Sequence, residues 1–452
     1  MRRRNNPILT LLIVLFCLVL LALAGYMLVQ VLPQKAPQEV TTIETNSVFE
    51  SDGQTVEPDR EQAYEGELPE QAEAAQPEQP DSEQPSEPAA DPAAPDDTPV
   101  TDAQKTAQAT LASMTEDEKL WQLFFVTPEA ITNVNTATVA GEATKNALAQ
   151  YPVGGIVYFA QNLEDRAQAA ALLANTQSYA KIPLFLGVDE EGGTVSRIGA
   201  NEALGGTKVA DMRSFGQRAD PAQVYAAGQT LAANLTGLGF NLDFAPDCDV
   251  VSGVDSVIGS RSFGSDPELC ASLAGVIVKS LRAEGVVSCL KHFPGYGSAT
   301  VDDHNGTSIV EKTLDELESC DLVPFQSIIA QEGSVPFVMV THLSYPNVTG
   351  SDTPADLSSA IVTDILRDKL GYQNVIITDS QSMSSITDHY SAGEAAVQAL
   401  AAGCDMILMP SDLQGAFDAV KAAVADGTLT QSRIDESVLR ILTVKAEYGI
   451  LQ

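Results

Sequence analysis

Short apolar runs that alternate with helical patterns are the feature that most constrains the fold of this chain. Such alternation is typical of βα units, whose strands lie parallel in one sheet. The apolar runs interpreted as strands are residues 120–126, 153–159, 183–189, 241–247, 286–292, 335–342, 374–380 and 404–409. The stretches interpreted as helices are residues 166–181, 221–239, 267–285, 314–331, 358–370 and 393–403, with further amphipathic helix over 416–451.

Eight such repeats within residues 103–452 predict an α/β fold, a (β/α)8 barrel of the TIM type. A doubly wound open sheet is the alternative, although eight regular repeats fit a closed barrel better. Catalytic groups of such barrels sit at the carboxyl ends of the strands. Nearly every predicted strand from the third to the seventh ends in or near ionisable residues: Asp189, Asp247, Asp249, Lys291, His292, His342 and Asp379. The sequence therefore predicts a polar cleft at one end of the barrel.

The segment after the fifth predicted strand combines a cation pair, a glycine-rich loop and an Asp-x-His pair. Residues 291–297 read Lys-His-Phe-Pro-Gly-Tyr-Gly, and Asp302 and His304 follow. An Asp two residues from a His can hydrogen-bond one ring nitrogen and leave the other facing a substrate. Taken alone, an Asp-x-His pair is better explained as two loop side chains that cap neighbouring backbone groups. Its position after a strand that ends in two cations favours an oriented proton donor and acceptor.

Residues 291–304 resemble the signature loop of the β-N-acetylglucosaminidases of glycoside hydrolase family 3, Lys-His-Phe-Pro-Gly-His-Gly followed by Asp-Ser-His. The resemblance runs through most of residues 103–452. Tyr296 stands where the family usually has His, and Asp303 stands where it has Ser. Neither departure removes the Asp-x-His pair.

Further motifs of the same family imply which residues hold the sugar. Residues 189–193, Asp-Glu-Glu-Gly-Gly, are similar to the family's Asp-Gln-Glu-Gly-Gly, and Thr194 replaces the Arg that usually follows. Residues 261–264 match Arg-Ser-Phe-Gly. The resemblance implies five substrate-binding side chains: Asp189, Arg197, Arg261, Lys291 and His292.

The segment 370–383 resembles the part of the family that carries the nucleophile, usually written Ser-Asp-Asp. Asp379 matches the nucleophile, and Ser380 replaces the second Asp. The implied reaction is retaining: Asp379 forms a covalent glycosyl intermediate, and His304, oriented by Asp302, acts as acid and then base. The implied substrate is a terminal β-linked N-acetylglucosamine of peptidoglycan fragments or chitooligosaccharides. No metal or cofactor is expected.

Other polar and aromatic residues fit structural roles better. Glu190 and Glu191 precede two glycines and are expected to help shape a tight turn. His342 has no charged partner nearby in sequence and is expected to be a structural or supporting residue. His389 lies beside Asp388 without a supporting motif, and the single tryptophan, Trp121, is expected in the core.

The N-terminal part predicts an anchor and a spacer. Residues 1–6 are basic and expected in the cytoplasm, and 7–30 form a transmembrane signal-anchor, because residues 8–29 carry no charge and can span a bilayer. Residues 31–102 form a disordered linker, and 103–452 the barrel domain. The predicted localisation is a single-pass membrane protein with its catalytic domain outside the cell. Ala22-Leu23-Ala24 leaves a cleaved signal peptide, and hence secretion, as the alternative.

Charge narrows the set of partners. The stretch 34–100 holds 18 acidic residues, two basic residues and ten prolines, which favours an extended chain. Without the charged residues of this stretch and the three N-terminal arginines, 43 of the 61 acidic and 20 of the 25 basic residues remain. The rest of the chain therefore carries a net charge of −23. Such a surface argues against nucleic acid and anionic lipid as partners. An uncharged carbohydrate substrate fits better.

Cysteine spacing indicates neither zinc nor a catalytic thiol. Beyond the apolar segment, five cysteines occur without a C-x-x-C pair, mostly in apolar surroundings: Cys248, Cys270, Cys289, Cys320 and Cys404. They are expected to be buried and inert.

Two alternative functions remain open. One is a β-glucosidase or β-xylosidase of the same family, although these usually take the acid/base from a second domain. The other is a catalytically inactive, membrane-tethered protein that binds the cell wall, to which the departures at Thr194, Tyr296, Asp303 and Ser380 would point.

Overall fold

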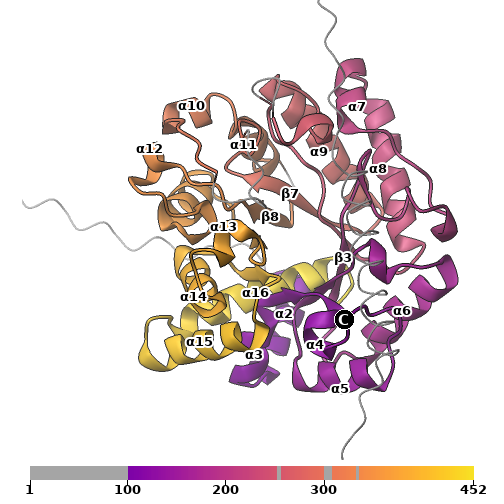
Figure 1. Cartoon of the computed structure of the whole chain (residues 1–452), viewed down its shortest axis with the longest axis vertical. Coiled ribbons are helices and arrows are strands. Elements are labelled where there is room, and N and C mark those ends of the chain that lie inside the picture. The colour runs from indigo at the N-terminus through magenta and orange to yellow at the C-terminus, as the bar shows by residue number, and fades with distance from the viewer. Residues whose placement is uncertain (1–99, 252–255, 300–307, 332–334) are drawn as a thin grey trace, which may run out of the picture. The chain divides into compact units, whose positions relative to one another are not determined.

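The computed structural model describes residues 100–251, 256–299, 308–331 and 335–452, which form a closed parallel barrel surrounded by helices (Figure 1). The barrel strands in chain order are β1 (Phe124–Val126), β2 (Gly155–Val157), β3 (Phe185–Val188), β6 (Leu242–Asp243), β7 (Val287–Phe293), β8 (Phe337–Val340), β9 (Val375–Ser380) and β10 (Met406–Leu408). Each pairs in parallel with its neighbour in the chain, and β1 pairs with β10, Phe124 opposite Ile407. The predicted TIM-type barrel is confirmed, and the open-sheet alternative is wrong because the edge strands join.

Helices precede β1, connect the successive strands and follow β10. Those of the first half are α2 (Asp102–Ser113), α3 (Glu116–Gln122), α4 (Pro128–Thr132), α5 (Glu142–Gln150), α6 (Arg166–Tyr179), α7 (Met212–Arg218), α8 (Pro221–Thr236) and α9 (Pro267–Ala283). Those of the second half are α10 (Leu314–Glu318), α11 (Val323–Ile329), α12 (Pro346–Thr349), the π-helix η6 (Ala360–Lys369), α13 (Ser384–Thr387), α14 (Ala392–Ala402), α15 (Leu413–Asp426) and α16 (Gln431–Glu447). Short 3₁₀ turns are η1 (Ala160–Asn162), η2 (Glu202–Leu204), η3 (Gly259–Arg261) and η5 (Ala355–Leu357).

Local capping explains where several helices begin. The side chains of Asp165, Asp220 and Asp266 accept backbone N–H bonds at the starts of α6, α8 and α9. A carboxylate at this position satisfies donors that have no partner inside the helix. The predicted helices over 166–181, 221–239 and 267–285 therefore begin where the sequence places them.

Two sequence predictions need correction. The predicted strand 120–126 is a strand only from Phe124, because Thr115 and Glu118 form a capping box that starts α3 and extends helix to Gln122. The predicted helix 314–331 is two helices, α10 and α11. The second of these has Pro324 in its first turn, where a missing N–H is tolerated, whereas a continuous helix would not tolerate it.

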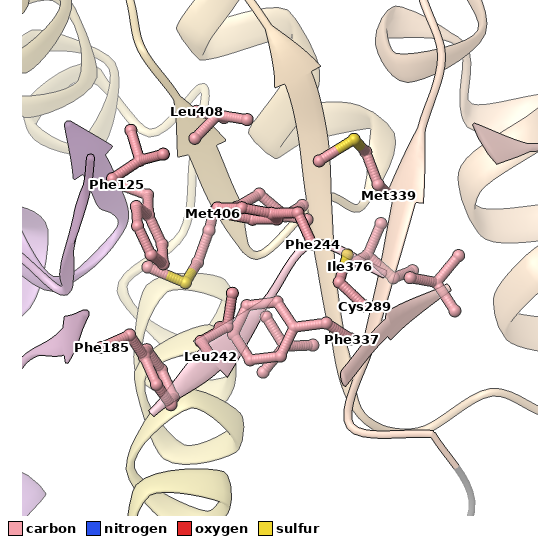
Figure 2. Packing of buried hydrophobic residues seen from close by; sticks show 14 of the residues in the cluster. Phe125, Phe185, Leu242, Phe244, Cys289, Phe337, Met339, Ile376, Met406 and Leu408 are labelled. Atoms are coloured by element: carbon pink, nitrogen blue, oxygen red, sulfur yellow. The ribbon is translucent and has the colours of Figure 1, made fainter. Parts of the chain in front are cut away.

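The barrel interior is filled by apolar side chains, many of them large, from most of its strands (Figure 2). Phe185 meets Phe337 edge-on across the barrel at 5.1 Å between ring centres, and Phe125 meets Phe244 at 5.2 Å in another contact of the same type. Trp121 stacks on Phe417 at 3.9 Å, as expected of a core residue. The packed interior means that a ligand can enter only at the barrel ends.

The predicted anchor, 7–30, and all but the last residues of the linker, 31–102, lie outside the described residues. Within the described ranges no helix is both long and apolar enough to cross a membrane.

Candidate active site

A cavity of about 460 Å³ opens at the carboxyl ends of the barrel strands. Its wall contains Asp189, Arg197, Arg261, Lys291, His292 and Asp379, which are all the predicted site residues that the structure describes. Asp302 and His304, the predicted acid/base pair, lie outside the described residues. The polar cleft expected from the strand ends is therefore present.

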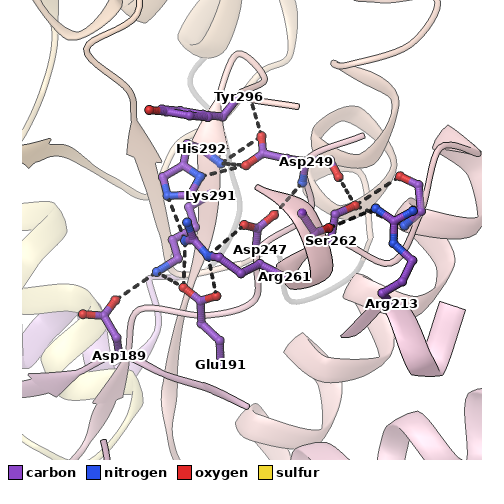
Figure 3. A network of polar contacts seen from close by, with 12 residues as sticks. Asp189, Glu191, Arg213, Asp247, Asp249, Arg261, Ser262, Lys291, His292 and Tyr296 are labelled. Atoms are coloured by element: carbon purple, nitrogen blue, oxygen red, sulfur yellow. Dashed lines mark hydrogen bonds and ion pairs between the residues drawn. The ribbon is translucent and has the colours of Figure 1, made fainter. Parts of the chain in front are cut away.

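Lys291 lines this cavity and lies between two carboxylates (Figure 3). Its Nζ lies 2.9 Å from Oδ1 of Asp189 and 2.7 Å from Oε1 of Glu191, and its side chain is almost fully buried. Burial by itself lowers the pKa of Lys291, but the charges of Glu191 and Asp189 outweigh it and raise the pKa. The ammonium group therefore stays charged.

Glu191 joins Lys291 to Arg261. Its two oxygens accept hydrogen bonds from Nε and Nη2 of Arg261, each at 2.9 Å, which is a bidentate pair. Although burial opposes ionisation, the charges of Lys291 and Arg261 hold the pKa of Glu191 far below its usual value. The sequence predicts only that Glu191 helps to shape a turn; its pairing with two cations in the cavity was not predicted.

Glu190, the residue before Glu191, does have the expected role of shaping a tight turn. Gly192 and Gly193 adopt positive φ angles of 88° and 58° in the turn between β4 (Glu190–Gly192) and β5 (Val195–Ser196). The carboxylate of Glu190 accepts N–H bonds from Arg197 and Ile198 at 2.7 and 2.8 Å and so closes this hairpin. The predicted turn is confirmed.

His292 is oriented by Asp249, which the sequence places at a strand end but which the motifs do not single out. Nδ1 of His292 lies 2.7 Å from Oδ2 of Asp249, and the same carboxylate accepts the backbone N–H of Tyr296 at 2.6 Å. Burial lowers the pKa of His292, but the charge and hydrogen bond of Asp249 raise it above 6.5. The other ring nitrogen, Nε2, lies 3.4 Å from Nη2 of Arg261. The carboxylate of Asp249 thus fixes both the ring and the first residues of the signature loop.

Asp379, at the end of β9, is the nucleophile candidate. Its Oδ1 accepts the N–H of Ser380 at 2.7 Å, and the side chain is partly exposed in the cavity. Desolvation raises the pKa of Asp379, but the charges of His292 and His342 lower it further than desolvation raises it. The carboxylate is therefore ionised at neutral pH, as a nucleophile must be.

His342 supports the same strand end. It is fully buried, with Nε2 2.9 Å from the carbonyl oxygen of Ser380 and Nδ1 3.1 Å from Oδ1 of Asp356. These contacts are consistent with the expected supporting role of His342. Its carboxylate partner, Asp356, is 14 residues away in the sequence and was not predicted.

Met409 lies in the cavity wall with a left-handed backbone, φ 49°. The other non-glycine residues with positive φ in the described ranges, Asn133 and Ala219, end helices α4 and α7, where this conformation is common. Met409 instead follows β10, and its N–H donates to the carbonyl oxygen of Phe125 at 2.8 Å. Such backbone strain clusters at functional sites.

Asp247, Asp249 and His292 bring three possible metal ligands within 4.8 Å of one another. However, Nε of Arg261 lies 3.5 Å from Oδ2 of Asp247, so a guanidinium already supplies positive charge there. Burial and the charge of Asp249 also raise the pKa of Asp247 to about 8, which leaves it a neutral acid at pH 7. These residues therefore do not fit a cation well.

The predicted character of the cysteines agrees with the structure. Cys248, Cys270, Cys289 and Cys404 are buried and unpaired, and Cys320 is partly buried. Burial raises the pKa of the Cys289 and Cys404 thiols, which suppresses the reactive thiolate.

A parallel barrel whose strand ends surround a polar cavity of this size is the arrangement of an enzyme for a small polar substrate. The glycosyl hydrolase family 3 N terminal domain model matches residues 115–444. The chain therefore belongs to glycosyl hydrolase family 3.

Similar proteins and structures with names also indicate a glycoside hydrolase of this family. "Beta-hexosaminidase LpqI" of Mycobacterium tuberculosis is 35% identical over 365 residues, 79% of this chain and 89% of that protein. "Beta-hexosaminidase A" of Pseudoalteromonas piscicida is 34% identical over 66% of this chain but only 54% of its own length. A family 3 β-N-acetylglucosaminidase structure from Paenibacillus sp. str. FPU-7 aligns with a TM-score of 0.70 and 34% identity, over 75% of this chain and 63% of that one. The expectation of a glycoside hydrolase with β-hexosaminidase homologues across most of the chain is confirmed.

Proposed function

We propose that this chain is a retaining β-N-acetylglucosaminidase that removes terminal β-linked N-acetylglucosamine from peptidoglycan fragments or chitooligosaccharides. The observation that carries the proposal is the carboxylate of Asp379, at the end of β9, in the wall of a cavity that is also lined by Lys291 and Arg261. Retaining hydrolysis needs such a carboxylate to attack the anomeric carbon. The β-hexosaminidase relatives support the choice of sugar.

In the first step Asp379 forms a bond to the anomeric carbon while His304 gives a proton to the departing oxygen. Asp302 is proposed to orient the imidazole of His304. In the second step His304 takes a proton from water, whose oxygen displaces Asp379 with net retention. Asp189, Arg197, Arg261, Lys291 and His292 would hold the hydroxyl and amide groups of the sugar: ionic donors and acceptors around one ring supply this kind of orientation.

A neutral imidazole repels an incoming anion less than a carboxylate would. Phosphate is therefore proposed to compete with water as the acceptor of the glycosyl group. Product analysis in phosphate buffer should detect the sugar 1-phosphate, and its absence would remove this part of the proposal.

The test of the function is release of nitrophenol from 4-nitrophenyl β-N-acetylglucosaminide by the wild type and by Asp379→Asn and His304→Ala. Turnover should fall at least about 10³-fold in Asp379→Asn and about 10²–10⁴-fold in His304→Ala. Turnover that survives in Asp379→Asn would overturn the assigned nucleophile. A folded wild type without activity on this substrate, the glucoside and the xyloside would favour the wall-binding alternative.

We also propose, from the sequence, that residues 7–30 anchor the chain in the cell membrane and that the barrel domain, 103–452, lies outside the cell. Fractionation of cells that express the full chain tests this: the protein should stay with membranes and become soluble when residues 1–30 are deleted. Cleavage after Ala24, seen as a shorter soluble chain, would support secretion instead.

A further inference from the structure

Two fully buried side chains form a His–Asp pair behind the nucleophile candidate. Nδ1 of His342, which follows β8, lies 3.1 Å from Oδ1 of Asp356 in η5. Backbone contacts fix Asp356: its N–H donates to the carbonyl oxygen of Thr341 at 3.2 Å, and its carbonyl oxygen accepts from Sγ of Cys404 at 3.5 Å. The carboxyl group is therefore held beside the ring of His342.

The contacts of the pair determine where its protons lie. Nε2 of His342 lies 2.9 Å from the carbonyl oxygen of Ser380, which can only accept, so Nε2 carries a hydrogen. Nδ1 faces Asp356, whose carboxyl oxygens have no other partner among the described residues. A neutral ring would turn a lone pair toward that carboxylate, so this contact needs a proton of its own. Imidazole holds a proton more strongly than a carboxylate does, and the pair is therefore an imidazolium beside a carboxylate.

The imidazolium is the member of the pair that lies next to Asp379. Its Nε2 bonds the carbonyl of Ser380, and the N–H of Ser380 donates to Oδ1 of Asp379 at 2.7 Å. Burial raises the pKa of Asp379, and the charges of His292 and then of His342 lower it. A positive charge stabilises a free carboxylate more than it stabilises the uncharged ester that a glycosylated aspartate forms.

We propose that the His342–Asp356 pair positions Asp379 and makes it a better leaving group in the second step of the proposed reaction. In that step the bond from the anomeric carbon to Asp379 breaks and its electron pair returns to the carboxylate. Water bonds to the same carbon and gives its proton to the general base. Neither member of the pair lines the cavity, so both act through Asp379 rather than on the sugar. The inference rests on the proposed function.

Asp356→Asn tests the charge and keeps the shape of the pair. The amide nitrogen can donate to Nδ1 of a neutral ring, and Nε2 can still donate to Ser380. With 4-nitrophenyl β-N-acetylglucosaminide, kcat should fall about three- to tenfold, on the order of one pKa unit of the leaving group. KM should fall by a similar factor and kcat/KM should stay nearly constant, because the glycosyl intermediate accumulates. Stopped-flow mixing should then show a burst of nitrophenol close to the enzyme concentration.

Two further variants separate this role from a structural one. His342→Gln combined with Asp356→Asn leaves no buried charge unpaired and should lower kcat in the same way. Asp243→Asn is the matched control: Asp243 is also fully buried and lies outside the cavity lining, so its kcat and KM should not change.

A fall of kcat/KM equal to that of kcat, without a burst, would mean that the pair serves only stability and would overturn the inference. Unchanged kinetics in Asp356→Asn would overturn it too. A folded wild type without turnover would instead overturn the proposed function, and the inference with it.

Discussion

The carboxylate of Asp249 bonds both to Nδ1 of His292, at 2.7 Å, and to the backbone N–H of Tyr296, at 2.6 Å. One side chain thus sets the charge of a cavity residue and the path of the loop that follows it. Because His292 lowers the pKa of Asp379, this contact also helps to keep the nucleophile candidate ionised.

Asp249→Asn should therefore narrow the pH profile of kcat/KM. Asp249 raises the pKa of His292, so the stabilisation of imidazolium is complete below about pH 6.5 and disappears as pH rises through the raised pKa. In the variant His292 should lose its proton at lower pH, so Asp379 loses a nearby cation and the acid limb of the profile should move to higher pH. A profile that keeps both limbs while stability falls would indicate a purely structural role, and Asp249→Glu should restore part of the width.

Removing the charge of Glu191 should affect substrate binding, whereas removing the charge of Glu190 should affect stability. Glu191→Gln should raise KM about tenfold or more, because Lys291 and Arg261 lose the counterion that positions them. Glu190→Gln should instead lower the free energy of unfolding by about 1–3 kcal/mol, since a carboxylate that accepts several N–H bonds is replaced, with KM unchanged. Urea unfolding and substrate titration of both variants separate the two roles, and identical behaviour would contradict the assignment.

Replacement of Met409 by glycine should separate stability from activity. A left-handed conformation costs a non-glycine residue about 1–2 kcal/mol, so Met409→Gly should unfold at a higher urea concentration than Met409→Ala. Both variants lose the side chain that lines the cavity and should show several-fold lower kcat/KM. Full activity in either variant would show that Met409 does not contact the substrate.

Lys445 should make stability rise with pH. It is fully buried, its Nζ donates to Oε1 of Gln122 at 2.7 Å, and burial lowers its pKa to about 7. Between about pH 7 and 10.5 the unfolded chain binds a proton that the folded chain does not, so the free energy of unfolding increases with pH by on the order of 5 kcal/mol.

Lys445→Met should remove this slope and be the more stable protein at pH 6, even though Gln122 loses a partner, which costs about 1–3 kcal/mol. Thermal or urea unfolding between pH 6 and 9 measures the slope. Lys421→Met is the matched control, because Lys421 is about half exposed in an ion pair with Asp117. A parallel pH dependence in the wild type and Lys445→Met would contradict the lowered pKa.

Local patterns in the sequence are enough to predict the barrel. Apolar runs of strand length, and helices begun by residues such as Asp220 and Asp266, depend on neighbours a few positions away. The errors are local too: α3 runs into the apolar residues before Phe124, and a proline divides 314–331. The strand-end rule also predicts which ionisable residues share one face, since parallel strands present their carboxyl ends together.

The pairing of those residues was decided by tertiary structure alone. Lys291 meets Asp189 from 102 positions away, and Arg261 meets Glu191 from 70, because closing the barrel brings the end of β7 and the segments after β3 and β6 around one cavity. The same closure gives neighbouring glutamates opposite roles: successive side chains of a strand point to opposite sides, so Glu190 faces its own hairpin and Glu191 faces the cavity. Sequence determined the residue types at the strand ends, and only the closed barrel determined which charges neutralise one another.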